Sequence, residues 1–110
     1  MAQFLVLYRS TVSARDQLAG ADPDQAREGM AAWMAWAQRA GEHIVDLGSP
    51  LAPAAQVGGG SGTVQPEQPT GFSVLRADST DAVVALLDGH PHLRAGGSVE
   101  VLEFLPLPGM

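Results

Sequence analysis

Residues 3–9, QFLVLYR, contain an uninterrupted run of apolar and aromatic side chains, at 4–8, and have neither glycine nor proline. Such a run predicts a β-strand. Successive side chains of a strand point to opposite faces of its sheet. One face would therefore carry Phe4, Val6 and Tyr8, and the other Leu5 and Leu7. Because both faces are apolar, we expect that each face of the sheet is covered.

The helix that follows this strand has clear start and stop signals. Asp22 is a favoured N-cap, Pro23 suits the first helical position, and Gln25 completes a capping box. The helix should run to Ala40 and end at Gly41. By contrast, residues 10–20 are polar and irregular in pattern, so no element is expected there.

One face of this predicted helix is apolar. The stripe comprises Ala26, Met30, Trp33, Ala37 and Ala40, with Trp36 beside it. A stripe at this spacing is typical of a helix that packs against a sheet. Trp36 is the residue that we expect to line a pocket.

Further elements follow downstream. Strands are predicted at 42–47, 71–77 and 98–105, and a helix at 82–87 after the capping residues Ser79, Thr80 and Asp81. Residues 51–69 are rich in glycine and proline, which predicts a long excursion with one short edge strand at 62–65.

The order of these elements is that of a ferredoxin-like α+β sandwich, βαβ(β)βαβ, with an antiparallel sheet in a single domain over residues 1–110. Two helices cover only one face of a four-stranded sheet. The apolar second face therefore predicts a homodimer that is joined sheet to sheet.

Composition excludes several classes of function. The chain has 110 residues and a net charge of −6, which argues against nucleic acid or an anionic membrane as a partner. It contains neither Cys nor Lys, so thiolate catalysis, cysteine-bound metals and Schiff-base chemistry are excluded. With no basic leader and only short apolar runs, a cytoplasmic protein is expected.

Short stretches along nearly the whole chain resemble the YCII-related (YciI-like) family. They are MAQFLVLYR at 1–9, the passage at 39–51, Gly71-Phe72 with Asp78 and Asp81-Ala82, and His90-Pro91 with GSVEV at 97–101. The resemblance implies a ferredoxin-like fold assembled as a dimeric α/β barrel. Some members resemble lyases or dehydrochlorinases that act on small aromatic or lactone substrates.

Two signatures of that family are missing from this chain. One branch carries a catalytic His on its first helix, at a position that aligns near Ala32, and residues 22–41 contain no His. The DGPF signature of another branch is also absent. The functional residues of these branches therefore do not carry over intact.

Asp46 is the first candidate for chemistry. In the predicted strand at 42–47, Ile44 and Asp46 are assigned to the face toward the dimer interior. Partial desolvation there would raise the pKa of a carboxyl group and suit it to act as a general base. Alternatively, Asp46 is solvated or paired with Arg9 or Arg76, which lie near strand ends and are themselves suited to hold an anionic ligand.

His90 and His92 are the second candidates. They follow the predicted helix at 82–87, whose negative end would favour the imidazolium form. Three roles stay open: an acid and base pair, a two-nitrogen metal clamp, or a turn in which the rings cap free carbonyls. Asp88 is the only acidic neighbour, so no metal site is predicted. For Tyr8 we expect core packing, with its hydroxyl at the rim.

These residues predict a cofactor-independent enzyme of the lyase or isomerase type, acting by acid/base catalysis on a small aromatic or anionic molecule. Asp46, His90 or His92 would move protons, and the substrate would contact Arg9, Arg76, Tyr8 and Trp36. The alternative is a non-catalytic ligand-binding or accessory homodimer. A heme- or flavin-dependent monooxygenase-like barrel is a third possibility.

Overall fold

The computed structural model describes residues 1–20, 22–59 and 67–109. The strands are β1 (Ala2–Ser10), β2 (Ile44–Asp46), β3 (Gln68–Ala77) and β4 (Ser98–Glu103). The helices are α1 (Ala14–Gly20), α2 (Pro23–Ala40), the short 3-10 helix η1 (Gly41–His43), α3 (Thr80–Leu86) and α4 (Pro91–Arg94).

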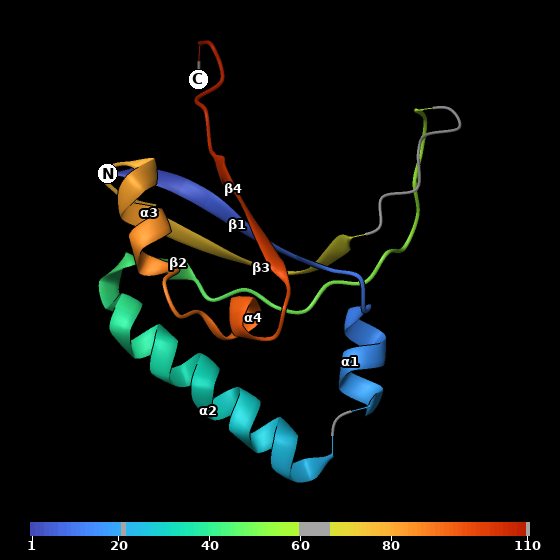
Figure 1. The fold of residues 1–110 in the computed structure, drawn as a ribbon. Coiled ribbons are helices and arrows are strands. Elements are labelled where there is room, and N and C mark those ends of the chain that lie inside the picture. Colours follow the sequence, from blue (N-terminus) through green and yellow to red (C-terminus); the bar gives the residue numbers. More distant parts are fainter. Residues whose placement is uncertain (21, 60–66, 110) are drawn as a thin grey trace.

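The strands form one antiparallel sheet in the order β2-β3-β1-β4 (Figure 1). β1 lies inside the sheet and pairs with β3 on one side and β4 on the other. This arrangement is compatible with a ferredoxin-like fold. The predicted α+β class and antiparallel sheet are confirmed.

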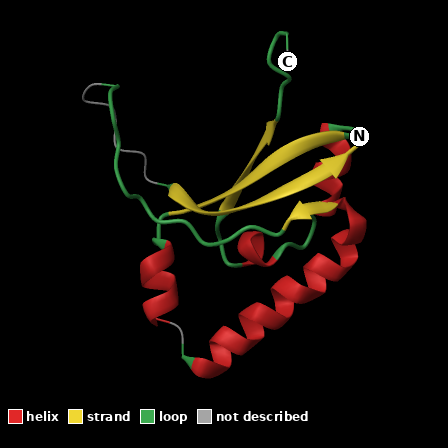
Figure 2. Cartoon of the chain, turned by 180° about the vertical axis from the view of Figure 1, so that it is seen from behind, coloured by secondary structure: helices red, strands yellow, loops and turns green. Residues whose placement is uncertain are grey.

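The main core lies between one face of the sheet and helices α2 and α3 (Figure 2). Its buried members are Phe4, Val6, Tyr8, Trp36, Ala40, Leu75, Ala77, Val83 and Leu87. The predicted alternation of β1 is confirmed, since its three core residues are the ones expected to share a face. We call this the covered face.

The opposite face of the sheet carries apolar side chains as well. In the strand register, Leu5 is paired with Val74 and Leu102, and Leu7 with Phe72. These residues are only partly buried or exposed, and in the described part of the chain no helix lies over them (Figure 2). We call this the open face.

The caps of α2 agree with prediction, whereas its buried stripe is only half as long as predicted. Asp22 accepts a hydrogen bond from the Gln25 N–H at 2.7 Å, and the chain turns at Gly41 with φ of 55°. Ala26 and Met30, however, are exposed. The N-terminal half of α2 extends beyond the sheet, so the strands do not cover these side chains (Figure 1).

Helix α1 contradicts the prediction that residues 10–20 are irregular. The Ser13 hydroxyl accepts a hydrogen bond from the Asp16 N–H at 3.1 Å, as an N-cap does. The overlooked signal is Ser13 followed three residues later by Asp16, a capping pattern for a helix start.

The predicted strand at 42–47 is shorter than expected, and its assigned face is wrong. Ile44 packs against the core on the covered face. A register irregularity separates it from Asp46, whose side chain is exposed. An irregular register breaks the two-residue alternation on which the prediction relied.

Smaller differences concern the other boundaries. Ser79 caps α3 as predicted, although the helix already begins at Thr80. The last strand ends at Glu103, before the predicted residue 105. The predicted edge strand at 62–65 falls outside the described residues. No helix in the described ranges has both the length and the apolar character needed to cross a membrane.

Candidate functional site

Five rings gather on the covered face of the sheet, and we call them the ring cluster. They belong to Tyr8 of β1, Trp33 and Trp36 of α2, and His90 and His92 at the start of α4. Neighbouring ring centroids lie between 4.4 and 6.2 Å apart. The protein's two tryptophans are both members.

His90 follows the end of α3, as predicted, and it also begins helix α4, which the sequence does not predict. Its backbone is extended, as expected for a residue before Pro91, and its Nδ1 accepts a hydrogen bond from the His92 N–H at 3.0 Å. The side chain therefore acts as the N-cap of α4.

The electrostatics of His90 also run opposite to the predicted preference for imidazolium. The ring is fully buried. Burial first, then the charges of His92 and Arg39, lower the pKa of His90 to about 4. The ring is consequently neutral at pH 7, and because Nδ1 is an acceptor, the proton sits on Nε2. That Nε2 is buried and has no hydrogen-bond partner among the described residues.

His92 is held differently and is only partly buried. Its Nε2 lies 2.8 Å from the backbone oxygen of Arg9, and since a carbonyl only accepts, Nε2 is the donor. Gly97 leaves room for the ring, because a Cβ there would lie 2.2 Å from Nε2. In the neutral ring the lone pair is thus on Nδ1, which forms no hydrogen bond within the described part of the chain. His92 is therefore able to accept a proton.

Tyr8 is more deeply buried than predicted. Its hydroxyl lies 2.8 Å from Ser73 Oγ, which itself donates to the Leu47 carbonyl at 2.6 Å. Tyr8 is therefore the donor to Ser73. Burial, partly offset by that bond, raises the pKa of Tyr8 to about 12, so its phenol stays neutral. The expectation of a hydroxyl at the rim is wrong.

The two candidate arginines lie at different places. Arg9 follows Tyr8 and offers its carbonyl to His92, while its guanidinium forms an ion pair with Glu100 at 3.3 Å. Arg76 is exposed and donates to the Glu42 carbonyl at 2.9 Å. Only Arg9 is thus joined to the ring cluster.

Asp46 lies in β2, at the far edge of the sheet from β4. Its carboxylate is exposed and accepts a hydrogen bond from the Gly48 N–H at 2.8 Å, which closes a local turn. The structure therefore brings together Tyr8, Arg9, Trp36, His90 and His92, whereas Asp46 and Arg76 lie apart from them.

Some members of the site were not predicted from the sequence as functional. Trp33 was assigned to packing, yet its ring lies 4.5 Å from that of His90. Its spacing of three residues from Trp36 was the available signal. For Gly97 and Ser73 the sequence contains no such signal, because their roles depend on contacts between distant segments. Within the described ranges, no group of three or more His, Asp or Glu side chains is arranged to hold a metal ion.

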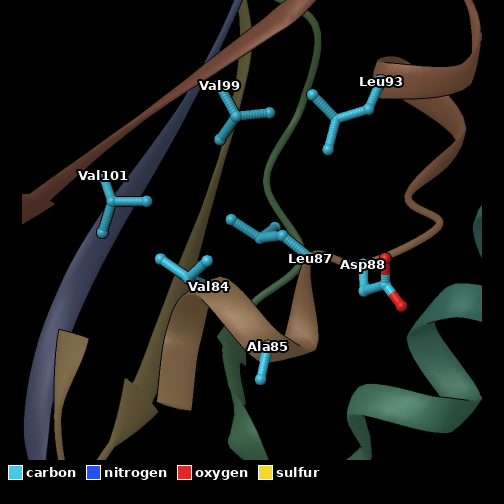
Figure 3. Close-up of a pocket in the computed structure, with 7 residues that line it drawn as sticks. All are labelled: Val84, Ala85, Leu87, Asp88, Leu93, Val99 and Val101. Atoms are coloured by element: carbon cyan, nitrogen blue, oxygen red, sulfur yellow. The ribbon is translucent and has the colours of Figure 1, made fainter. Parts of the chain in front are cut away.

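A groove with a volume of about 600 Å³ lies between α3, α4 and β4 (Figure 3). Its lining consists of Val84, Ala85, Leu87, Asp88, Leu93, Val99 and Val101. Six of these seven side chains are apolar. The Asp88 carboxylate points away from them (Figure 3).

No protein-family model matches the sequence, and no curated protein matches it significantly. Among solved structures, the chain is similar to the 5-chloro-2-hydroxyhydroquinone dehydrochlorinase TftG from Burkholderia phenoliruptrix AC1100, in complex with 2,5-dihydroxybenzoquinone. The TM-score is 0.54 at 20% sequence identity, over 96% of this chain and 94% of that chain. At this identity the similarity shows a shared α+β fold.

Proposed function

We propose that this chain is a YCII-like enzyme that moves a proton on a small aromatic or anionic molecule without a redox cofactor. His92 is the proton acceptor. The observation that supports this role is the bond from its Nε2 to the Arg9 carbonyl, which fixes the ring and leaves the Nδ1 lone pair unused. A base positioned in this way contributes about 10²- to 10⁴-fold to a rate.

The other cluster members would support that step. Arg9 fixes the His92 ring through its backbone carbonyl, while its guanidinium is paired with Glu100. His90 positions His92, because its Nδ1 holds the His92 backbone N–H. The structural similarity to a dehydrochlorinase supports a lyase-type reaction on a small ring compound.

A binding experiment tests this site directly. 2,5-Dihydroxybenzoquinone is titrated into the purified protein, and the His and Trp side-chain signals are followed by NMR. We expect shifts at His92 and Trp33, and loss of binding in His92→Gln. Shifts confined to other parts of the protein would refute the proposed site.

The matched control for this experiment is His43→Gln. His43 also forms a bond from a ring nitrogen to a backbone carbonyl, that of Arg76 at 2.9 Å, but it lies beside β2 at the opposite edge of the sheet. The control should bind like the wild type. Release of chloride from 5-chloro-2-hydroxyhydroquinone by the wild type, lowered at least 100-fold in His92→Gln, would identify a dehydrochlorinase.

A non-catalytic binding protein is the second candidate. It is favoured by the separation of Asp46 from His92, which leaves the imidazole without a carboxylate partner among the predicted site residues. Binding of the quinone with no turnover of any hydroxyquinone substrate, and with equal affinity in His92→Gln, would favour this candidate.

We also propose a homodimer through the open face, as in a dimeric α/β barrel. Leu5, Leu7, Phe72 and Val74 form an apolar surface there that a second copy would bury. Leu5→Asp should leave the fold intact and abolish this association in sedimentation velocity. A wild type that is monomeric at about 100 μM would rule it out.

A further inference from the structure

β4 lies at one edge of the described sheet, and its outer backbone groups have no strand partner there. The Phe104 N–H donates to the Gln3 carbonyl, so even-numbered residues of this strand direct their backbone groups toward β1. Because this direction alternates along a strand, the backbone N–H and C=O groups of Val99, Val101 and Glu103 point away from β1, toward the outer edge of the sheet. An edge of this kind is a template for another strand.

The apolar groove lies directly beside this free edge. Val99 and Val101 form one wall, and α3 and α4 the other. In Figure 3, Leu93 lies near Val99 at one end of the groove, and Val84 lies near Val101 at the other. A strand added to β4 would thus place alternate side chains in the groove.

The C-terminal tail has the chemistry of such a strand. Residues 104–109, FLPLPG, carry no charge and extend away from the sheet (Figure 1). Leu105 and Leu107 are 78% and 65% exposed. Being two residues apart, they share one face and one edge of an extended chain. Pro106 and Pro108 bias the residues before them toward extended backbone.

The two prolines also restrict which edge of the tail can pair. Proline has no N–H to donate, so the edge that carries Pro106 and Pro108 cannot take a further strand. The edge that carries Leu105 and Leu107 keeps its donors. The tail can therefore pair with one strand, and its pairing ends there.

Residues 104–109 do not return to their own groove, because they extend away from the sheet (Figure 1). A second copy can supply the tail instead. Two chains of charge −6 repel each other, so contact is favoured where both surfaces lack charge. The tail has no charge, and the groove has only Asp88 at its margin.

We propose that the C-terminal tail of a second copy pairs antiparallel with the outer edge of β4 and places its leucines in the groove. Leu105 of the second copy lies opposite Val101, and Leu107 opposite Val99, so that Leu107 reaches Leu93. The same register applied from the other chain makes the exchange reciprocal and closed. This interface is separate from the open face and from the ring cluster.

The first experiment measures self-association of the full chain by sedimentation velocity. Leu107→Asp, or removal of residues 105–110, should weaken one association step at least tenfold. Val57→Asp is the matched control, since Val57 is an exposed valine, 96% accessible, in a loop, and it should behave like the wild type. Equal association of Leu107→Asp and Val57→Asp would overturn the proposal.

Mixing variants shows whether the contact joins two copies. Leu107→Asp has a defective tail and Leu93→Asp a defective groove, so a mixture of the two restores one intact contact. We expect the mixture to associate more tightly than either variant alone. No gain on mixing would contradict an exchange between copies.

Cross-linking reports which residues of the two copies meet. The chain has no native cysteine, so Leu107→Cys and Leu93→Cys can be made separately and mixed under mild oxidation. A mixed disulfide dimer should form faster than one between Leu107→Cys and Leu18→Cys, a control on exposed α1. Equal rates would refute the contact. Leu5→Asp should leave this cross-link intact, which separates it from the open-face dimer.

Discussion

The two faces of the central strand β1 have nearly the same composition and very different environments. Phe4 and Val6, on the covered face, are 1% and 0% exposed. Leu5 and Leu7 alternate with them in the sequence and remain only partly buried on the open face. An apolar side chain in a strand is therefore buried only where another element packs over it. An open face that is equally apolar indicates a surface suited to association.

The largest expected effect comes from a matched pair of substitutions, one on each face, which tests whether the two faces differ in their contribution to stability. Leu75→Ala on the covered face should lower the free energy of unfolding by about 3 kcal/mol, because it opens a cavity in the core. Leu5→Ala on the open face should lower it by about 1 kcal/mol or less in the monomer. Urea denaturation measures both. Equal losses at low protein concentration would show that the faces do not differ, while a loss for Leu5 that grows with concentration would support the open-face dimer.

The next effect concerns His90, a polar group inside the covered face. Its folded pKa of about 4 lies below the ordinary value of 6.5 for histidine, so the unfolded chain binds more protons between these two values. This contribution to stability is present above pH 6.5 and is lost as the pH falls toward 4, a change on the order of 2–3 kcal/mol. Thermal unfolding from pH 7 to 4 should show a shallower loss in His90→Asn, which keeps an N-cap acceptor and removes the titrating ring. If thermal stability falls between pH 7 and 4 as steeply in His90→Asn as in the wild type, the low pKa assigned to His90 is wrong.

A smaller effect is expected from the buried hydroxyl of Tyr8. Tyr8→Phe removes one hydrogen bond to Ser73, while Ser73 keeps its bond to the Leu47 carbonyl. The free energy of unfolding should fall by about 1 kcal/mol. Denaturation of both proteins in the same buffer checks this value, and a loss as large as that of Leu75→Ala would mean that the hydroxyl organises the covered face more than its single bond explains.

The smallest expected effect tests the register of the proposed tail exchange along β4, at the edge of the sheet. With Leu105 opposite Val101, Glu103 lies opposite Glu103 of the second copy, and like charges that face each other across strands are unfavourable. Glu103→Gln should therefore tighten the association by about twofold to fivefold, most clearly at low salt. Weaker association would exclude this register.

Much of the fold could be predicted from local sequence. The Asp22 to Gln25 capping box, the Gly41 stop and the alternation of residues 3–9 are short-range signals, and each of them was confirmed. They succeed because a cap or an alternating strand depends on residues at most a few positions apart.

The site was less predictable because its geometry joins distant segments. Residue types alone indicated Tyr8, His90 and His92, but the charge state predicted for His90 was reversed by burial beneath α2. The face of Asp46 was misassigned because β2 carries a register irregularity beside β3.

The sequence by itself determined the order of the four strands and of helices α2 and α3, the caps of these two helices and the exclusion of thiol and Schiff-base chemistry, because these depend on composition and near neighbours. Tertiary structure alone decided that His90 is neutral, that His92 is anchored by Arg9, and that a groove lies beside the free edge of β4. Desolvation and ring contacts arise only when β1, α2 and α4 meet, and no local pattern encodes that meeting.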